Sequence, residues 1–102
     1  MHNINRFLSI KNKIKEVRTL ALIGITEAGS GHPGASFSAA EIMGSLYFQI
    51  MRYDITNPFS KGRDYFINSK AHSAPGYYAT LSLTGSFAKE EMKTLRKLNS
   101  RL

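Results

Sequence analysis

The chain has 102 residues, which fits one small domain, and no repeat or linker divides it. It has no apolar run of about 18 residues for a transmembrane helix, and its N-terminus lacks the apolar core of a secretory signal. Cysteine is absent, which excludes disulfides and thiolate metal sites and is consistent with a cytoplasmic, reducing location. The net charge of +7 would suit a nucleic acid, but the basic residues are scattered among acidic ones, which favours solvated helix faces.

The first predicted element is a long helix over residues 4–28. Apolar residues recur in it at spacings of three and four, the pattern of one buried helix face: Phe7, Ile10, Ile14, Val17, Ala21 and Gly24. After Leu20 the segment is apolar nearly all round, so we expect its C-terminal half to be buried on more than one side. Gly29 is expected to end the helix.

A turn with a histidine at its centre comes next. Residues 29–34 read GSGHPG, and three glycines with a proline cannot continue a helix. Ser38 and Glu41 have the spacing of a capping box, which predicts a second helix over residues 39–52 with Ser38 as its N-cap. His32 would then lie just before a helix N-terminus, where partial positive charge and free N–H groups suit a phosphate or another anion.

The predicted second helix is apolar on two adjacent sides, which indicates burial in a core rather than a ligand site. Gly44 within it is expected to allow another backbone to approach closely. A polar connection over residues 53–64 follows, because Asn57-Pro58 stops the helix. Residues 65–68 (YFIN) are then β-rich and without polar alternation, which is consistent with a buried parallel strand.

A second histidine loop follows this predicted strand. His72 lies among small residues just before Pro75-Gly76, and a helix is predicted over residues 75–84. A strand that feeds a polar loop and then a helix is a standard place for a site in an open α/β sheet. Ser86 is expected to cap a last helix over residues 88–98, whose charges follow the helix dipole. Taken alone, each histidine could simply be a loop residue whose ring nitrogens are hydrogen-bonded within the protein, with no role in a site.

Together the two loops resemble the start of transketolase. The resemblance rests on SGHPG at residues 30–34 and DYFINSKAHSAPGYYA at residues 64–79, and it runs from about residue 14 to residue 98. 1-Deoxyxylulose-phosphate synthase begins in a related way, but the GHPG loop is more like transketolase. The resemblance implies that residues 1–102 are an incomplete, N-terminal part of the pyrophosphate-binding domain. The expected fold class is α/β, mostly helical with one or two short parallel strands.

The resemblance also implies a chemistry: transfer of a two-carbon ketol unit from a ketose phosphate to an aldose phosphate, with thiamine diphosphate and Mg²⁺. His32 matches the histidine that contacts the sugar substrate and assists proton transfer, and His72 matches the one beside the cofactor's diphosphate. Ser69 and Lys70 are expected near the cofactor. Ala71 stands where the family usually has Gly, which would disturb His72 only if φ is positive there; we expect a negative φ.

The family's Gly-Asp-Gly motif and the Asn after it, which hold the metal, do not occur in this chain. We therefore expect a piece of a transketolase that is inactive alone. The remaining transketolase sequence or a C-terminal subunit would complete it, with a dimer as the complete form. Two alternatives stay open, a small basic helical nucleic-acid-binding protein and a non-catalytic assembly module. The site interpretation requires His32 and His72 to lie within about one small ligand of each other.

Overall fold

The structure, a computed structural model, describes residues 2–102, with side chains described from residue 4 onwards. Its α-helices are α1 (His2–Ala28), α2 (Pro33–Ser45) and α3 (Ala74–Leu83). One π-helical turn, Leu46–Ile50, continues α2, and short 3-10 helices span Ala71–Ser73 and Lys89–Thr94. The fold is therefore mostly helical.

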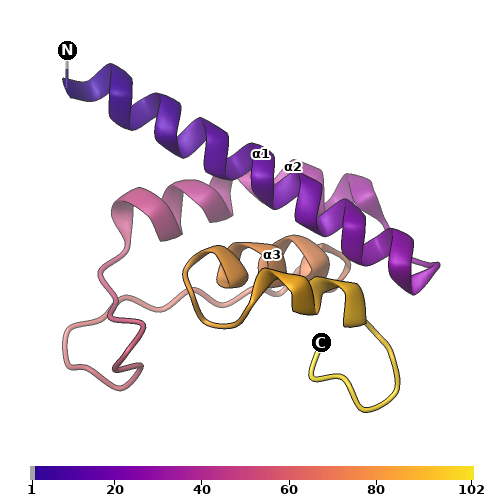
Figure 1. The fold of residues 1–102 in the computed structure, drawn as a ribbon. Helices are drawn as coiled ribbons and strands as arrows, with labels where there is room; N and C mark the ends of the chain where they lie inside the picture. Colours follow the sequence, from indigo (N-terminus) through magenta and orange to yellow (C-terminus); the bar gives the residue numbers. More distant parts are fainter. Residues whose placement is uncertain (1) are drawn as a thin grey trace.

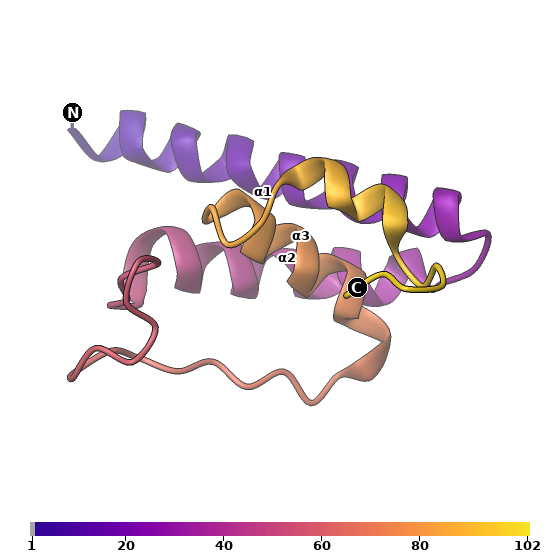
Figure 2. The same ribbon diagram turned by 60° about the horizontal axis from the view of Figure 1, so that its bottom comes forward.

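The long helix α1 is the element on which the others pack. Figure 1 shows α2 and α3 lying against it, and in Figure 2 the segment around Lys89–Thr94 runs alongside it. The chain reverses at the end of α1, so α2 returns along α1 in the opposite direction (Figure 1). The prediction of a long first helix that ends at Gly29 is confirmed, since the Gly29 N–H donates to the Ile25 carbonyl over 3.0 Å.

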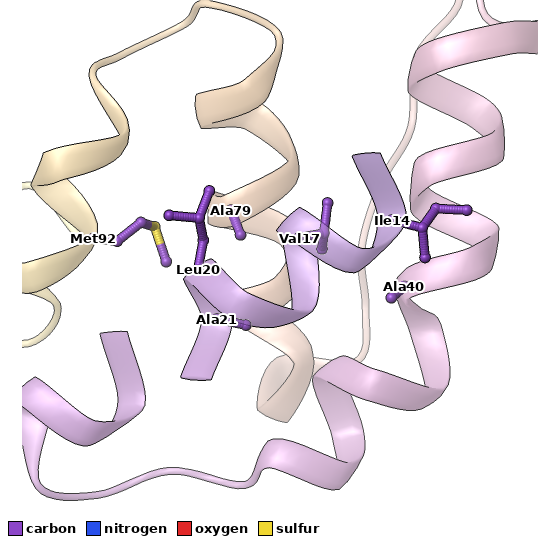
Figure 3. Close-up of a cluster of buried hydrophobic side chains, with 7 residues drawn as sticks. All are labelled: Ile14, Val17, Leu20, Ala21, Ala40, Ala79 and Met92. Atoms are coloured by element: carbon purple, nitrogen blue, oxygen red, sulfur yellow. The ribbon is translucent and has the colours of Figure 1, made fainter. Parts of the chain in front are cut away.

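The core lies where α1 meets α2, α3 and the last 3-10 helix. Figure 3 shows its side chains between these ribbons: Ile14, Val17, Leu20, Ala21, Ala40, Ala79 and Met92. Much of the predicted stripe is therefore buried. Phe7, however, is 65% exposed, because the N-terminal half of α1 extends beyond the helices that cover the rest of it (Figure 1). Among residues 2–102, no helix is both long and apolar enough to cross a membrane.

Gly44 lies where α2 crosses α1. A Cβ atom placed on Gly44 would lie 2.5 Å from Cγ1 of Ile14, well inside van der Waals contact. Another element does approach closely at Gly44, but what fills the space is the Ile14 side chain of α1 rather than a backbone as expected. Glycine is needed at this position because any side chain would push the two helices apart.

The predicted start of the second helix is wrong. α2 begins at Pro33, and its N-cap residue, His32, makes no side-chain capping bond. Proline suits the first turn because its φ is already helical and its missing N–H would have had no partner there. Ser38 therefore lies inside the helix, where its hydroxyl donates to the Ala35 carbonyl over 3.2 Å, and Glu41 instead accepts a charged hydrogen bond from Arg18.

Two other predicted elements also differ. Residues 65–68 run as an extended ribbon (Figure 2), but no strand forms in the described part of the chain, because no backbone hydrogen bond joins them to another segment. The last predicted helix is a short 3-10 helix without a side-chain cap, and Ser86 hydrogen-bonds Thr84 instead. Positive φ angles of 60° at Arg96 and 68° at Asn99 prevent this helix from continuing.

Candidate functional site

The two histidine loops meet at one end of the molecule. The ring centroids of His32 and His72 lie 4.6 Å apart, with the ring planes inclined at 45°. His32 comes from the N-cap of α2, and His72 from the 3-10 helix just before α3. The separation satisfies the distance condition set from the sequence, and the rings are close enough to share one wall of a site rather than to face each other across a ligand.

The first loop fixes His32 through its glycines. Gly29 has a φ of 72° and Gly31 a φ of 146°, values that residues with a side chain rarely adopt. A Cβ atom on Gly31 would also lie 2.9 Å from Cγ1 of Ile25 on α1. The loop therefore turns tightly over the end of α1 and delivers His32 directly to the first turn of α2.

The second loop is closed by its own side chains. The Ser73 hydroxyl donates to the Lys70 carbonyl over 2.7 Å, and the Asn68 amide donates to the Ser73 hydroxyl over 3.1 Å. Among the residues that the structure describes, positive φ outside glycine occurs only at Arg96 and Asn99, so Ala71 is not in the left-handed region. The expectation of a negative φ is confirmed, and Ala71 imposes no strain on His72.

Two helix starts converge behind the histidines. The Gly76 N–H, in the first turn of α3, donates to the buried Ser36 hydroxyl of α2 over 3.0 Å. A Cβ atom on Gly76 would lie 3.0 Å from the Cβ of Ser36, so glycine permits this close crossing. The N-termini of α2 and α3, with their partial positive charges, therefore lie on the same side of the body.

Lys70 and Ser69 take different positions. The Lys70 ammonium donates to the Ser38 hydroxyl over 2.7 Å and thereby ties the second loop to α2. Ser69 is exposed. Neither residue lines the cavity beside the histidines. The structure therefore brings His32 and His72 together and places Lys70 and Ser69 at the margin.

A small cavity of about 190 Å³ lies against the two imidazoles. Besides His32 and His72, its lining includes Tyr78, Leu95 and Arg96, and no carboxylate side chain lines it. The Arg96 guanidinium donates to the Ser30 hydroxyl over 2.5 Å, joining the C-terminal segment to the first histidine loop. The imidazoles and the guanidinium favour an anionic ligand, although Leu102, the last residue of the chain, also lines the cavity and accepts a hydrogen bond from the Arg96 N–H over 2.9 Å.

Arg96, which lines the cavity and donates to Ser30, is a residue that sequence reasoning missed. Arg96 looked like one of several basic residues on a solvated helix face, and no local pattern separates it from its neighbours. Its backbone, with φ at 60°, lies in a region that residues with a side chain seldom occupy. Among the side chains that the structure describes, residues 4–102, no group of three or more His, Asp or Glu could hold a metal ion.

Comparison with known proteins shows which family the chain belongs to. Residues 9–102 match the family model described as "Transketolase, thiamine diphosphate binding domain". The chain is 40% identical to human transketolase over 94 residues, which is 92% of this chain but 15% of the human protein. It is 37% identical to chloroplastic transketolase of Spinacia oleracea over 95 residues, which is 91% of this chain and 13% of that protein.

A shorter relative is also similar. The "6-deoxy-6-sulfo-D-fructose transketolase subunit SqwG" of Clostridium sp. (strain MSTE9) is 37% identical over 90 residues, which is 88% of this chain and 33% of that protein. The family match covers the two histidine loops and all three helices in part or whole. The chain therefore belongs to the transketolase family, in its thiamine diphosphate binding domain, and it spans a minor part of the length of these relatives.

Proposed function

We propose that this chain supplies the first part of a transketolase active site, which transfers a two-carbon ketol unit from a ketose phosphate to an aldose phosphate. The observation that carries the proposal is the 4.6 Å separation of His32 and His72, two residues that are forty positions apart in the motifs resembling transketolase. Thiamine diphosphate, when bound, supplies the carbanion chemistry that the side chains of this domain cannot supply.

We assign His32 to the sugar substrate. A neutral imidazole donates a hydrogen bond from one nitrogen and accepts at the other, so it can hold a substrate hydroxyl and move its proton near neutral pH. The junction between the glycine loop and α2 fixes the backbone of His32, while its exposed ring makes no capping hydrogen bond and so stays available to a substrate.

We assign His72, Ser69 and Lys70 to the diphosphate of the cofactor. Donors and cations stabilise phosphate oxygens, and the two converging helix N-termini add partial positive charge. The cavity fits a diphosphate in its chemistry, since Arg96 lines it and no carboxylate side chain does. Lys70 would need to leave the Ser38 hydroxyl to reach such a ligand, which is a modest rearrangement for a flexible exposed side chain.

The site needs more sequence than this chain contains. A cavity of about 190 Å³ is smaller than the roughly 300–1,000 Å³ of a typical cofactor site. We infer that the remaining transketolase sequence or a C-terminal subunit completes the site, contributes the ligands of Mg²⁺ and brings the dimer. The word "subunit" in the name of the Clostridium relative supports a division between chains. We place the assembled enzyme in the cytoplasm.

A chimeric enzyme tests the proposal. The stretch of human transketolase that matches residues 9–102 is replaced by this chain, and ketol transfer between sugar phosphates is measured. We expect His32→Asn and His72→Asn each to lower kcat/KM by roughly 10²- to 10⁴-fold. Lys61→Gln, in the exposed connection, is the control and should leave transfer unchanged. A folded, active chimera in which both histidine variants keep most of their activity would refute the site assignment.

Experiments on the isolated chain and on the chimera distinguish the proposed function from the two alternatives, a nucleic-acid-binding protein and a non-catalytic assembly module. By calorimetry it should not bind thiamine diphosphate with micromolar affinity, and such binding would overturn the proposal that the site is incomplete. A nucleic-acid-binding protein would instead retain duplex DNA in a gel shift as salt is raised, whereas scattered surface charge loses it with modest added salt. A non-catalytic assembly module would give a chimera that assembles but transfers no ketol unit.

A further inference from the structure

The ring nitrogens of His32 and His72 have no hydrogen-bond partner in the described part of the chain. His32 makes no capping bond, and the bonds that close the second loop run between Asn68, Lys70 and Ser73 without His72. Both histidines are exposed, although they line the small cavity. An imidazole nitrogen that is not hydrogen-bonded can serve as a ligand for a transition-metal ion. The pair therefore offers two nitrogen ligands that an ion can reach from solvent.

The spacing of the two rings matches one particular coordination geometry. Imidazole nitrogens bind first-row divalent ions at about 2.0–2.1 Å, so two rings held at about 90° on one ion have centres roughly 4.5 Å apart. At the tetrahedral angle of zinc, about 109°, the centres would lie roughly 5.2 Å apart. The centroids of His32 and His72 are 4.6 Å apart. The spacing therefore favours two neighbouring positions on an octahedral or tetragonal ion, the geometry of Ni²⁺ and Cu²⁺.

The backbone holds the two rings at this spacing. The tight glycine turn fixes His32 at the start of α2, and the Ser73 hydroxyl closes the turn around His72. The start of α3 is tied to α2 by the Gly76 N–H, which donates to the buried Ser36 hydroxyl over 3.0 Å. Because the two backbone segments are already fixed, little conformational entropy is lost when both rings bind one ion.

The other groups around the cavity determine what else such an ion carries. No carboxylate side chain lines the cavity, and no group of three His, Asp or Glu side chains forms within residues 4–102. An ion held by two imidazoles alone keeps its other positions for water or an anion. Arg96 also lines the cavity, where it donates to the Ser30 hydroxyl, and its positive charge repels a bare cation. The surroundings therefore suit an ion that already carries an anionic chelator.

We propose that His32 and His72 form a two-imidazole site for a divalent transition-metal ion of the Ni²⁺ or Cu²⁺ type, whose other positions carry water or a small anionic chelator. The proposal needs only the spacing and accessibility of the two rings, so it does not depend on the proposed function. The two uses of the rings exclude each other, because an ion on His32 occupies the nitrogen assigned to the sugar substrate.

A chelated nickel ion tests the site. Ni²⁺–nitrilotriacetate is the probe, because this chelator leaves two neighbouring positions of the ion open. Calorimetry should show one ion bound per chain. His32→Ala and His72→Ala should each weaken binding at least about tenfold, because the second imidazole binds in effect within the same molecule. The double variant should bind little more weakly than either single one. Undiminished binding in either single variant would overturn the proposal.

His2, the one other histidine of the sequence, provides the control. His2→Ala should bind the probe as the original chain does. Loss of binding in His2→Ala, with binding kept in His32→Ala, would place the ion at the N-terminus and overturn the proposal. Circular dichroism checks that each variant keeps its helices.

A measurement on the unaltered chain does not depend on any variant folding. The Cu²⁺ chelate is paramagnetic, so it should broaden the amide NMR signals of both loops, at Gly31 and Ala71, before those of the connection around Lys61. Broadening of only one loop, or of neither, would overturn the shared site.

The charge of Arg96 gives a second, independent test. Arg96→Gln should tighten the binding of hydrated Ni²⁺ several-fold, because a positive charge beside the ion is removed. Lys61→Gln removes the same charge from the exposed connection and should leave the affinity unchanged, because solvent and salt screen distant charges. Equal affinities in the two variants would show that the ion does not bind beside Arg96 and would contradict the proposal.

Discussion

The helical body and the connection between α2 and α3 differ in how many of their apolar side chains they bury. Where α1, α2 and α3 meet, apolar residues face one another, and Val17, Ala40 and Ala79 are fully buried. Away from these contacts the helices also expose apolar residues, and Phe7 of α1 and Ile42 of α2 are 65% and 62% exposed. In the connection, Phe59, Tyr65 and Ile67 are largely exposed. A helix satisfies its backbone within one segment and needs only a packing partner, whereas an extended segment needs a neighbour for its backbone as well. The helices are therefore complete in themselves, whereas the backbone of residues 65–69 has no hydrogen-bond partner in the described part of the chain.

Tyrosines join these two regions. Tyr47, in the π-helical turn that follows α2, hydrogen-bonds Tyr77 of α3 through the two hydroxyls over 3.2 Å. The Tyr53 hydroxyl, from the connection, donates to the Tyr47 carbonyl over 2.5 Å. Phe66 packs against both Tyr47 and Tyr77, which holds the inner face of the extended segment on the body.

The largest effect is expected from a cavity in the body. Met92 is fully buried against α1, close to Gly24, and Met92→Ala should lower the free energy of unfolding by about 2–5 kcal/mol in urea titrations. Leu98, 93% exposed in the same C-terminal segment, is the control, and Leu98→Ala should change it by less than about 0.5 kcal/mol. Similar losses for both variants would show that the C-terminal segment does not belong to the core.

A smaller effect is expected where α2 crosses α1. Gly44→Ala should cost about 1–3 kcal/mol of unfolding free energy, since the new methyl group would meet Ile14 of α1. Gly34→Ala is the matched control on the same helix, because a Cβ there has no heavy atom within 4 Å. It should be neutral or stabilising by up to about 1 kcal/mol, the difference in helix propensity. The variants are compared by thermal and urea unfolding, and a destabilised Gly34→Ala with an unaffected Gly44→Ala would contradict this packing.

The sequence predicts the parts of this structure that depend on local patterns. The spacing of apolar residues on α1 predicts Ile14, Val17 and Ala21 as one buried face, and Gly29 marks its end. The start of α2 was predicted wrongly, because Ser38 and Glu41 fit a capping box while Pro33 begins the helix earlier. The two local signals placed the start of the helix at different residues. The helix begins at Pro33 because the φ of proline is already fixed at a helical value.

The candidate site also has a part that local sequence patterns predict and a part that they do not. The motifs predict that His32 and His72 converge, and the structure places their rings 4.6 Å apart, while the roles of the two residues remain proposals. Arg96 could not be found in this way, because it reaches Ser30 across 66 positions through a fold of the C-terminal segment that no local pattern indicates. Residues 65–68 were expected to form a strand, but that pattern cannot show whether a neighbouring strand is present.

The smallest predicted effect concerns the tyrosine junction at high pH. Burial, and then the hydrogen bond with Tyr77, raise the pKa of Tyr47 above its ordinary value of 10.0. The folded chain therefore keeps a proton that the unfolded chain loses above pH 10, so its stability is complete below that pH and declines as pH rises further. The free energy of unfolding should fall by up to about 1.4 kcal/mol per pH unit for this group. In Tyr47→Phe the decline should be shallower but not absent, because burial also raises the pKa of Tyr53. Urea titrations between pH 8 and pH 11.5 measure how steeply the free energy of unfolding falls with pH in the original chain and in Tyr47→Phe. Identical slopes would show that the Tyr47 hydroxyl is open to solvent and not buried at the junction.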